Sequence, residues 1–245
     1  MILSGFSALW VQSSWQDAWL AMAVVGLCVT VWNVMQMPKK AVDGSALKAK
    51  APLSVRLFTR TDCIPLYGTL LVYGVLFSVY ITFSMDLLSS SGVMKPLAGM
   101  FFWPLLGLAG LATASTGGVV SRYGVRVLLS VSLPLCGLSY AMLVFASDHQ
   151  WLILASAILF GATSIAPGTG FLVWGIRLFS ERPSVGSGTV YFFLTIGTII
   201  GPIVFGWISS RVGVSTAFLS MTALSVAVLP FFPRRVFDTQ HVREL

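Results

Sequence analysis

Long apolar runs, separated by short polar segments, dominate the chain. A membrane-crossing helix needs about 20 predominantly apolar residues, and seven stretches meet this requirement by length and lack of charge. They are residues 16–37, 64–86, 98–120, 126–146, 150–177, 187–210 and 214–232. Residues 1–14 are apolar but too short to cross. The pattern predicts an all-α polytopic membrane protein with seven transmembrane helices.

Composition supports this class and excludes others. The chain is 56% hydrophobic and 9% charged, whereas a soluble domain carries about 25% charged residues. No CxxC pair, metal-ligand spacing, phosphate-binding loop or catalytic motif is present in the sequence. We therefore expect a protein of the lipid bilayer that is not an enzyme, with no metal, no cofactor and no nucleic-acid partner.

The cationic residues are divided unequally between the two sides of the predicted membrane. Thirteen lysines and arginines fall on one side, and the opposite loops contain only Lys95 and Arg211. Cationic loops remain in the cytoplasm under the positive-inside rule. The division predicts a multi-pass plasma (inner) membrane protein whose C-terminus is cytoplasmic and whose N-terminus is extracytoplasmic.

A short motif, Gly-x-x-x-Ser-Arg-x-Gly, occurs twice. GGVVSRYGVR covers residues 117–126, and GWISSRVGVS covers residues 206–215, 89 positions later. At the same offset, Phe102–Trp103 corresponds to Tyr191–Phe192. Three predicted spans separate the copies, so they lie on opposite sides of the membrane. This favours two inverted three-helix repeats, which are typical of secondary transporters; the alternative is that glycine and arginine recur at helix ends.

These features resemble the major facilitator superfamily. The family's loop motif is Gly-x-x-x-Asp-Arg-x-Gly-Arg-Arg/Lys, which Gly117, Arg122, Gly124 and Arg126 match, while Ser121 replaces the acidic residue. The stretch GTIIGPIVFG at residues 197–206 is similar to the glycine–proline pattern of helices at the interface between the two halves of family members. The long basic linker at residues 38–61 resembles the family's central cytoplasmic loop.

The resemblance implies a domain organisation. Residues 1–14 would be the stub of a preceding transmembrane helix, 15–37 helix six, 38–63 the basic cytoplasmic linker, 64–233 the C-terminal six-helix bundle of two inverted repeats, and 234–245 a cytoplasmic tail. Helices one to four and part of helix five would be absent, so the chain would supply the C-terminal half of a translocation path that it shares with an N-terminal half.

The resemblance implies secondary active transport of a small organic molecule by alternating access. A coupling ion such as H⁺ is a candidate partner. The alternative is a truncated, non-transporting remnant, or a subunit that needs a partner half. A small organic molecule is expected as the substrate because the candidate cavity residues are aromatic and uncharged.

Several residues are candidates for these roles. On the first helix after the linker, a stripe at helical spacing either lines the cavity or forms hydrogen bonds between helices; it consists of Thr69, Tyr73, Tyr80 and Ser84. The aromatic residues related by the repeat either flank a shared cavity or lie in an interfacial belt; they are Phe102, Trp103, Tyr191 and Phe192.

The remaining candidates concern movement and coupling. The loop motif acts in gating or only anchors the topology, and it comprises Gly117, Ser121, Arg122, Gly124 and Arg126. The hinge candidates are Pro167, Gly168, Gly201 and Pro202. Gly197 and Gly201 form a small-xxx-small pair of the kind that packs helices closely. Asp86 is the candidate coupling residue within the chain.

Overall fold

The computed structural model describes residues 15–36, 60–90, 96–147 and 149–232, and its regular elements in these ranges are all helices. The expected stub at 1–14, most of the linker at 38–63 and the tail at 234–245 lie outside the described residues. The all-α expectation is confirmed for the part of the chain that the structure describes.

The helices follow the apolar runs of the sequence closely. In chain order they are α2 (Trp15–Gln36), η3 (Thr61–Cys63), α3 (Ile64–Ser90), α4 (Pro96–Ala109), η4 (Gly110–Ser115), α5 (Thr116–Val144), η5 (Phe145–Ser147), α6 (Gln150–Ser164), α7 (Ala166–Leu178), α8 (Pro183–Val212), α9 (Val214–Ala227) and η6 (Leu229–Phe231).

Six of the described segments are long and apolar enough to cross a membrane. The sequence predicts seven. The counts differ because most of the expected spans 98–120 and 126–146 is joined in one continuous segment, Phe101–Val144, of 44 residues. The backbone leaves the helical conformation inside this segment at Gly124, with φ 84° and ψ 164°. Gly213 has nearly the same conformation, φ 83° and ψ 155°, between α8 and α9. Essentially only glycine adopts this region of backbone space.

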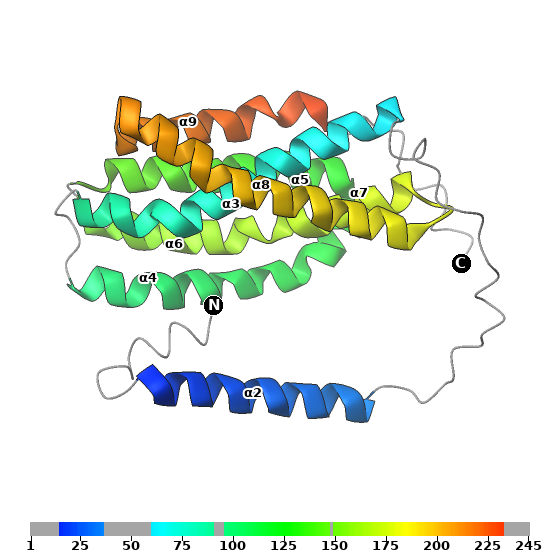
Figure 1. The fold of residues 1–245 in the computed structure, drawn as a ribbon, viewed down its shortest axis with the longest axis horizontal. Coiled ribbons are helices and arrows are strands. Elements are labelled where there is room, and N and C mark those ends of the chain that lie inside the picture. The colour runs from blue at the N-terminus through cyan, green and yellow to red at the C-terminus, as the bar shows by residue number, and fades with distance from the viewer. Residues whose placement is uncertain (1–14, 37–59, 91–95, 148, 233–245) are drawn as a thin grey trace.

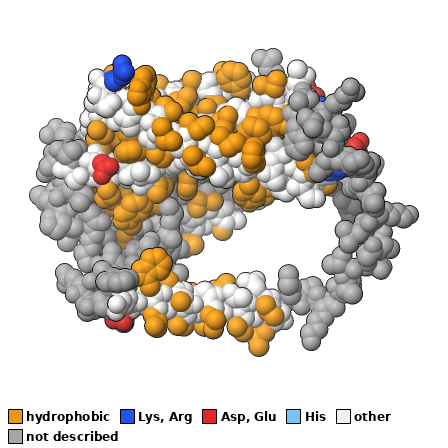
Figure 2. All heavy atoms as spheres, viewed as in Figure 1, with side chains coloured by type: hydrophobic (Ala, Val, Ile, Leu, Met, Phe, Trp, Pro, Cys, Tyr) orange, Lys and Arg blue, Asp and Glu red, His pale blue; other side chains and the backbone are white. Residues whose placement is uncertain are grey.

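The helices lie roughly antiparallel in a bundle (Figure 1). Helices α3, α5 and α8 run in one direction, and α4, α6 with α7, and α9 run in the other. Helix α2 lies apart from the bundle, and its apolar window is 0% buried. Apolar side chains cover the length of the bundle between charged ends, as expected for a surface that faces lipid (Figure 2).

Glycines set the closest helix approaches. Where α3 crosses α8, a Cβ added to Gly197 would press on the Leu71 carbonyl oxygen and lie 3.1 Å from the Gly74 Cα. A Cβ added to Gly201 would lie 2.9 Å from the Val75 Cα. The predicted small-xxx-small packing of Gly197 and Gly201 is therefore confirmed. Where α4 crosses α6, Gly161 lies in a similar way against the Leu106 carbonyl.

Gly197→Leu should destabilise the bundle by about 1–3 kcal/mol, the usual cost of overpacking, because the new side chain meets the backbone of α3. Thermal unfolding in detergent, followed by tryptophan fluorescence, measures this. Gly206→Leu is the matched control on the same helix, since a Cβ at Gly206 meets nothing within 4 Å. Equal stability of the two variants would contradict the packing described.

Candidate functional site

The polar–aromatic stripe of α3 points into the bundle. Thr69, Tyr73, Tyr80 and Ser84 are all buried, with at most 5% of any of them exposed. These four side chains thus lie inside the protein. The four side chains differ in what they contact, and these contacts connect α3 to the helices around it.

Tyr73 contacts the point where one long apolar run breaks into two helices. Pro167 lies in the first turn of α7 and has no N–H to donate. The Gly168 N–H donates to the Ile165 carbonyl at 3.0 Å, whereas in a regular helix it would donate to Ser164. The Tyr73 hydroxyl instead donates to the Ser164 carbonyl at 2.6 Å. The Tyr73 side chain on α3 therefore supplies the hydrogen-bond donor that the Ser164 carbonyl lacks in its own helix.

Tyr80 forms a second connection, through α6 to α5. Its hydroxyl is 2.6 Å from the Ser156 hydroxyl. Ser156 in turn donates to the Ser139 carbonyl at 2.7 Å, so the Tyr80 hydroxyl is the donor to Ser156. Tyr140 on α5 donates to the Leu76 carbonyl on α3. The three helices α3, α6 and α5 are thus joined pairwise by hydrogen bonds.

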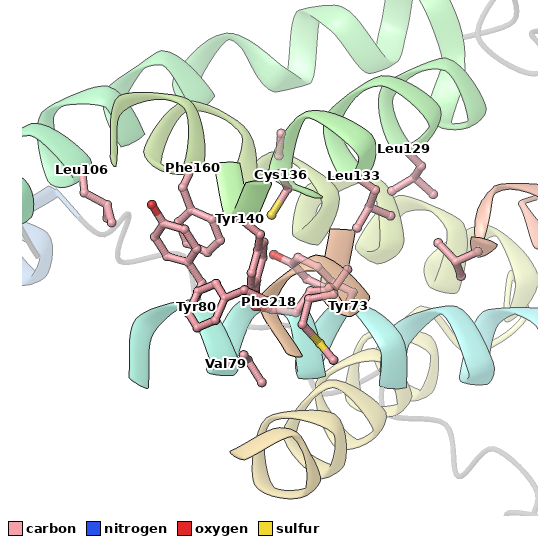
Figure 3. Packing of buried hydrophobic residues seen from close by; sticks show 14 of the residues in the cluster. Tyr73, Val79, Tyr80, Leu106, Leu129, Leu133, Cys136, Tyr140, Phe160 and Phe218 are labelled. Atoms are coloured by element: carbon pink, nitrogen blue, oxygen red, sulfur yellow. Dashed lines mark hydrogen bonds between the residues drawn. The ribbon is translucent and has the colours of Figure 1, made fainter. Parts of the chain in front are cut away.

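Aromatic rings surround this network (Figure 3). The Tyr80 ring stacks on Phe160 with centroids 3.6 Å apart and planes 6° apart. Tyr140 meets Tyr80 edge-on at 5.2 Å and approaches Phe218 of α9 at 5.5 Å. These contacts bury large apolar area around the hydroxyls, which strengthens the hydrogen bonds by excluding water.

The other two residues of the stripe are less connected. The Thr69 hydroxyl is directed at the carbonyls of Pro65 and Leu66 in its own helix, at 2.7 Å and 3.0 Å. The Ser84 hydroxyl is buried with no hydrogen-bond partner among the described residues. An isolated hydroxyl of this kind offers a donor to whatever reaches it.

The aromatic residues related by the repeat do not share one environment. Phe102 is buried and packs on Tyr80, with centroids 6.2 Å apart. Trp103 is half-buried and lies edge-on to Phe102 at 5.3 Å. Tyr191 and Phe192 are exposed on α8, with 59% and 62% of their surfaces accessible. The structure thus does not bring the two pairs into one cavity.

The two copies of the loop motif have matching local geometry. Ser121 donates to the Gly118 carbonyl at 2.9 Å, and Ser210 donates to the Trp207 carbonyl at 2.8 Å. Gly117 at the head of the first copy lies in the first turn of α5, and Arg126 is exposed just beyond the break at Gly124.

The arginine shared by the two motif copies lies over an aromatic ring in each copy. Arg122 is 5.5 Å from the ring centre of Tyr123, and Arg211 is 4.6 Å from that of Trp207. Such contacts hold a cationic side chain beside an apolar surface.

The remaining hinge and coupling candidates lie outside this network. Gly201 and Pro202 are within α8, which continues to Val212. Asp86 is exposed near the end of α3. Apart from tyrosine, the buried polar side chains of the described residues are all serine or threonine. No group of three or more potential metal ligands occurs among the described residues.

Comparison with known proteins identifies the family. The family described as "Uncharacterised MFS-type transporter YbfB" matches residues 2–231. The chain belongs to this family of MFS-type transporters. Neither the curated proteins nor the solved structures gave a match.

For this MFS-type transporter, sequence reasoning missed half of the buried network. Tyr140, Ser156 and Phe160 were not singled out, although Tyr140 and Ser156 lie within predicted spans. The signal was available, because a hydroxyl inside a membrane span needs a partner within the protein. Applying this requirement to the spans 126–146 and 150–177 would have singled out Tyr140 and Ser156.

Tyr73→Phe should cost about 0.6 kcal/mol of stability, the average of hydrogen bonds between membrane helices, because the Ser164 carbonyl loses its donor. In a Pro167→Ala background the cost should fall, since the Gly168 N–H can then return to Ser164. Unfolding of the four proteins of this double-mutant cycle in detergent measures the coupling. Tyr191→Phe, on an exposed ring, is the control; equal losses in both backgrounds would contradict the role of the bend.

Proposed function

We propose that the protein is a secondary active transporter that moves a small, uncharged organic molecule by alternating access, and that this chain supplies the C-terminal half of the translocation path. The observation that carries the proposal is the match to the transporter family over residues 2–231. It is supported by the apolar helical bundle and by its neutral buried network.

The proposed architecture is seven crossings, the last six forming two inverted repeats. The break at Gly124 divides the 44-residue segment into two spans of usual length. Gly124 and Gly213 occupy equivalent motif positions and share one rare conformation. The first repeat would comprise α3, α4 and α5, and the second α6 with α7, α8 and α9. The first helix of each repeat packs on the second helix of the other, so that α3 contacts α8 and α6 contacts α4. The opposite senses of the two triplets in Figure 1 support the same symmetry.

Movement is proposed to centre on the bend between α6 and α7. At Pro167 and Gly168 the Ser164 carbonyl has no hydrogen-bond donor from its own helix, and the Tyr73 hydroxyl donates to it. Rotation of α7 about the bend would break or remake this bond and change the exposure of the stripe on α3. We therefore retain Thr69, Tyr73, Tyr80 and Ser84 as proposed substrate contacts in a more open state, with Phe102 and Trp103 behind them.

The exposed face of α8 is proposed to meet the N-terminal half. Only 17% of the α8 window is buried, and its exposed large residues recur at helical spacing, as Phe192, Ile199, Ile203 and Trp207 show. A coupling ion such as H⁺ would be held by Asp86 or by a carboxylate of the partner half. The same face favours the alternative of a subunit that transports nothing without that half.

The proposed orientation, with the C-terminus in the cytoplasm of a plasma (inner) membrane, has a direct test. Alkaline phosphatase fused after His149 should be active, because it is exported, and green fluorescent protein fused after Gln240 should be fluorescent. Exchanging the two reporters is the control and should silence both. Phosphatase activity after Gln240 would overturn the orientation.

Transport should depend on the bend. Cells that express the protein should accumulate the uncharged aromatic probe N-phenylnaphthylamine, or a related neutral aromatic compound, to a different level from cells that do not. Pro167→Ala should reduce that difference at least about tenfold, a change of about 1.4 kcal/mol in the switching barrier, with unchanged membrane abundance. Pro134→Ala, in the part of α5 beyond the break at Gly124, is the matched control. No difference for any neutral aromatic compound would count against the proposed substrate class.

A further inference from the structure

A groove of about 550 Å³ lies between the N-terminal half of α3 and the C-terminal end of α9. Its apolar lining includes Ile64, Pro65, Gly68 and Val72 of α3 together with Leu224 and Phe231 at the α9 end. The Thr69 hydroxyl on its wall is directed at carbonyls of its own helix. The groove therefore offers mainly apolar surface, with threonine hydroxyls as its polar side-chain groups.

The dimensions of the groove match one leaflet of a bilayer. From Thr61 to Val72 the rise along a helix is about 16 Å at 1.5 Å per residue. Half of the hydrocarbon core of a membrane is about 15 Å thick. A chain that enters beside Thr61 and follows the groove would end near the middle of the membrane.

Charged residues of both signs, Arg60 and Asp62, flank Thr61, which lines one end of the groove. Arg60 directly precedes Thr61, and its guanidinium is 3.6 Å from the Asp62 carboxylate, with both side chains largely exposed. Arg60 also lines a small pocket of about 90 Å³ together with Glu181 and Arg182. A loose, exposed ion pair contributes little to stability, about 0–1 kcal/mol, so its two charges can be shared with a ligand that carries the opposite pair.

We propose that this groove binds one membrane phospholipid, with an acyl chain along α3 and α9 and a headgroup that carries both a phosphate and an amine. The phosphate lies at Arg60 and the ammonium group at Asp62. The adjacent apolar and paired-charge surfaces favour this amphipathic occupant over a soluble one. The inference rests on the membrane embedding of the bundle and does not depend on transport.

Gly68 provides the test, because a Cβ added there meets nothing within 4 Å. Gly68→Leu should fill the groove without disturbing the fold, and Gly188→Leu on exposed α8 is the matched control, with equally open space. The full chain is purified in detergent with equal amounts of phosphatidylethanolamine and phosphatidylglycerol of identical chains. Native mass spectrometry then measures the retained lipid, and thermal unfolding verifies that each variant is folded.

The wild-type chain should retain one phospholipid and prefer phosphatidylethanolamine about threefold, the size of a surface charge contact. Gly68→Leu should retain at least about fivefold less lipid, because several methylene groups lose their apolar contact, whereas Gly188→Leu should match the wild type. Asp62→Asn should abolish the preference, and Arg60→Gln should weaken retention of both lipids.

Three results would overturn the proposal. Undiminished lipid on Gly68→Leu would place the lipid elsewhere. Equal loss on Gly188→Leu would indicate general coating of the bundle. A wild-type dimer that Gly68→Leu converts to a monomer would assign the groove to a second copy of the chain.

Discussion

Main-chain carbonyls inside a membrane have no water to bind, so each must find a donor in the protein. In this bundle the requirement is sharpest at the bend before Pro167, where the helix cannot supply a donor to Ser164. The Tyr73 hydroxyl supplies it from another helix. This bond and the similar bonds of Tyr80 and Tyr140 join α3 to α6 and α5 around the bend.

The same helix α3 is fixed on its other side by glycine. The absence of side chains at Gly74, Gly197 and Gly201 lets the α8 backbone approach that of α3 directly. Without a hydrophobic driving force between helices in lipid, such close packing and interhelical hydrogen bonds are the main sources of association. Helix α3 is therefore hydrogen-bonded to its neighbours on one face and packed against the α8 backbone on another.

Much of this fold could be predicted from the sequence, because a membrane allows few alternatives to apolar helices. The runs at 64–86 and 187–210 became α3 and α8 within four residues of their expected ends. The break at Pro167 was also expected. The sequence could not reveal the partner of each hydroxyl, since Tyr80 and Ser156 are 76 residues apart and meet only through the tertiary arrangement. Nor does a repeated aromatic pair indicate burial, because Phe102 is buried whereas Tyr191 at the same repeat position is exposed.

The neutrality of the interior has an electrical consequence. A charge that crosses a membrane at a potential of 100 mV exchanges about 2.3 kcal/mol with the field. The buried polar side chains of the described helices are hydroxyls without net charge, so rearranging them displaces no formal charge across the bilayer. The membrane voltage consequently does almost no direct work on this bundle. Any voltage dependence of transport must originate in charges other than these buried side chains, such as those of a charged cargo or a co-transported ion.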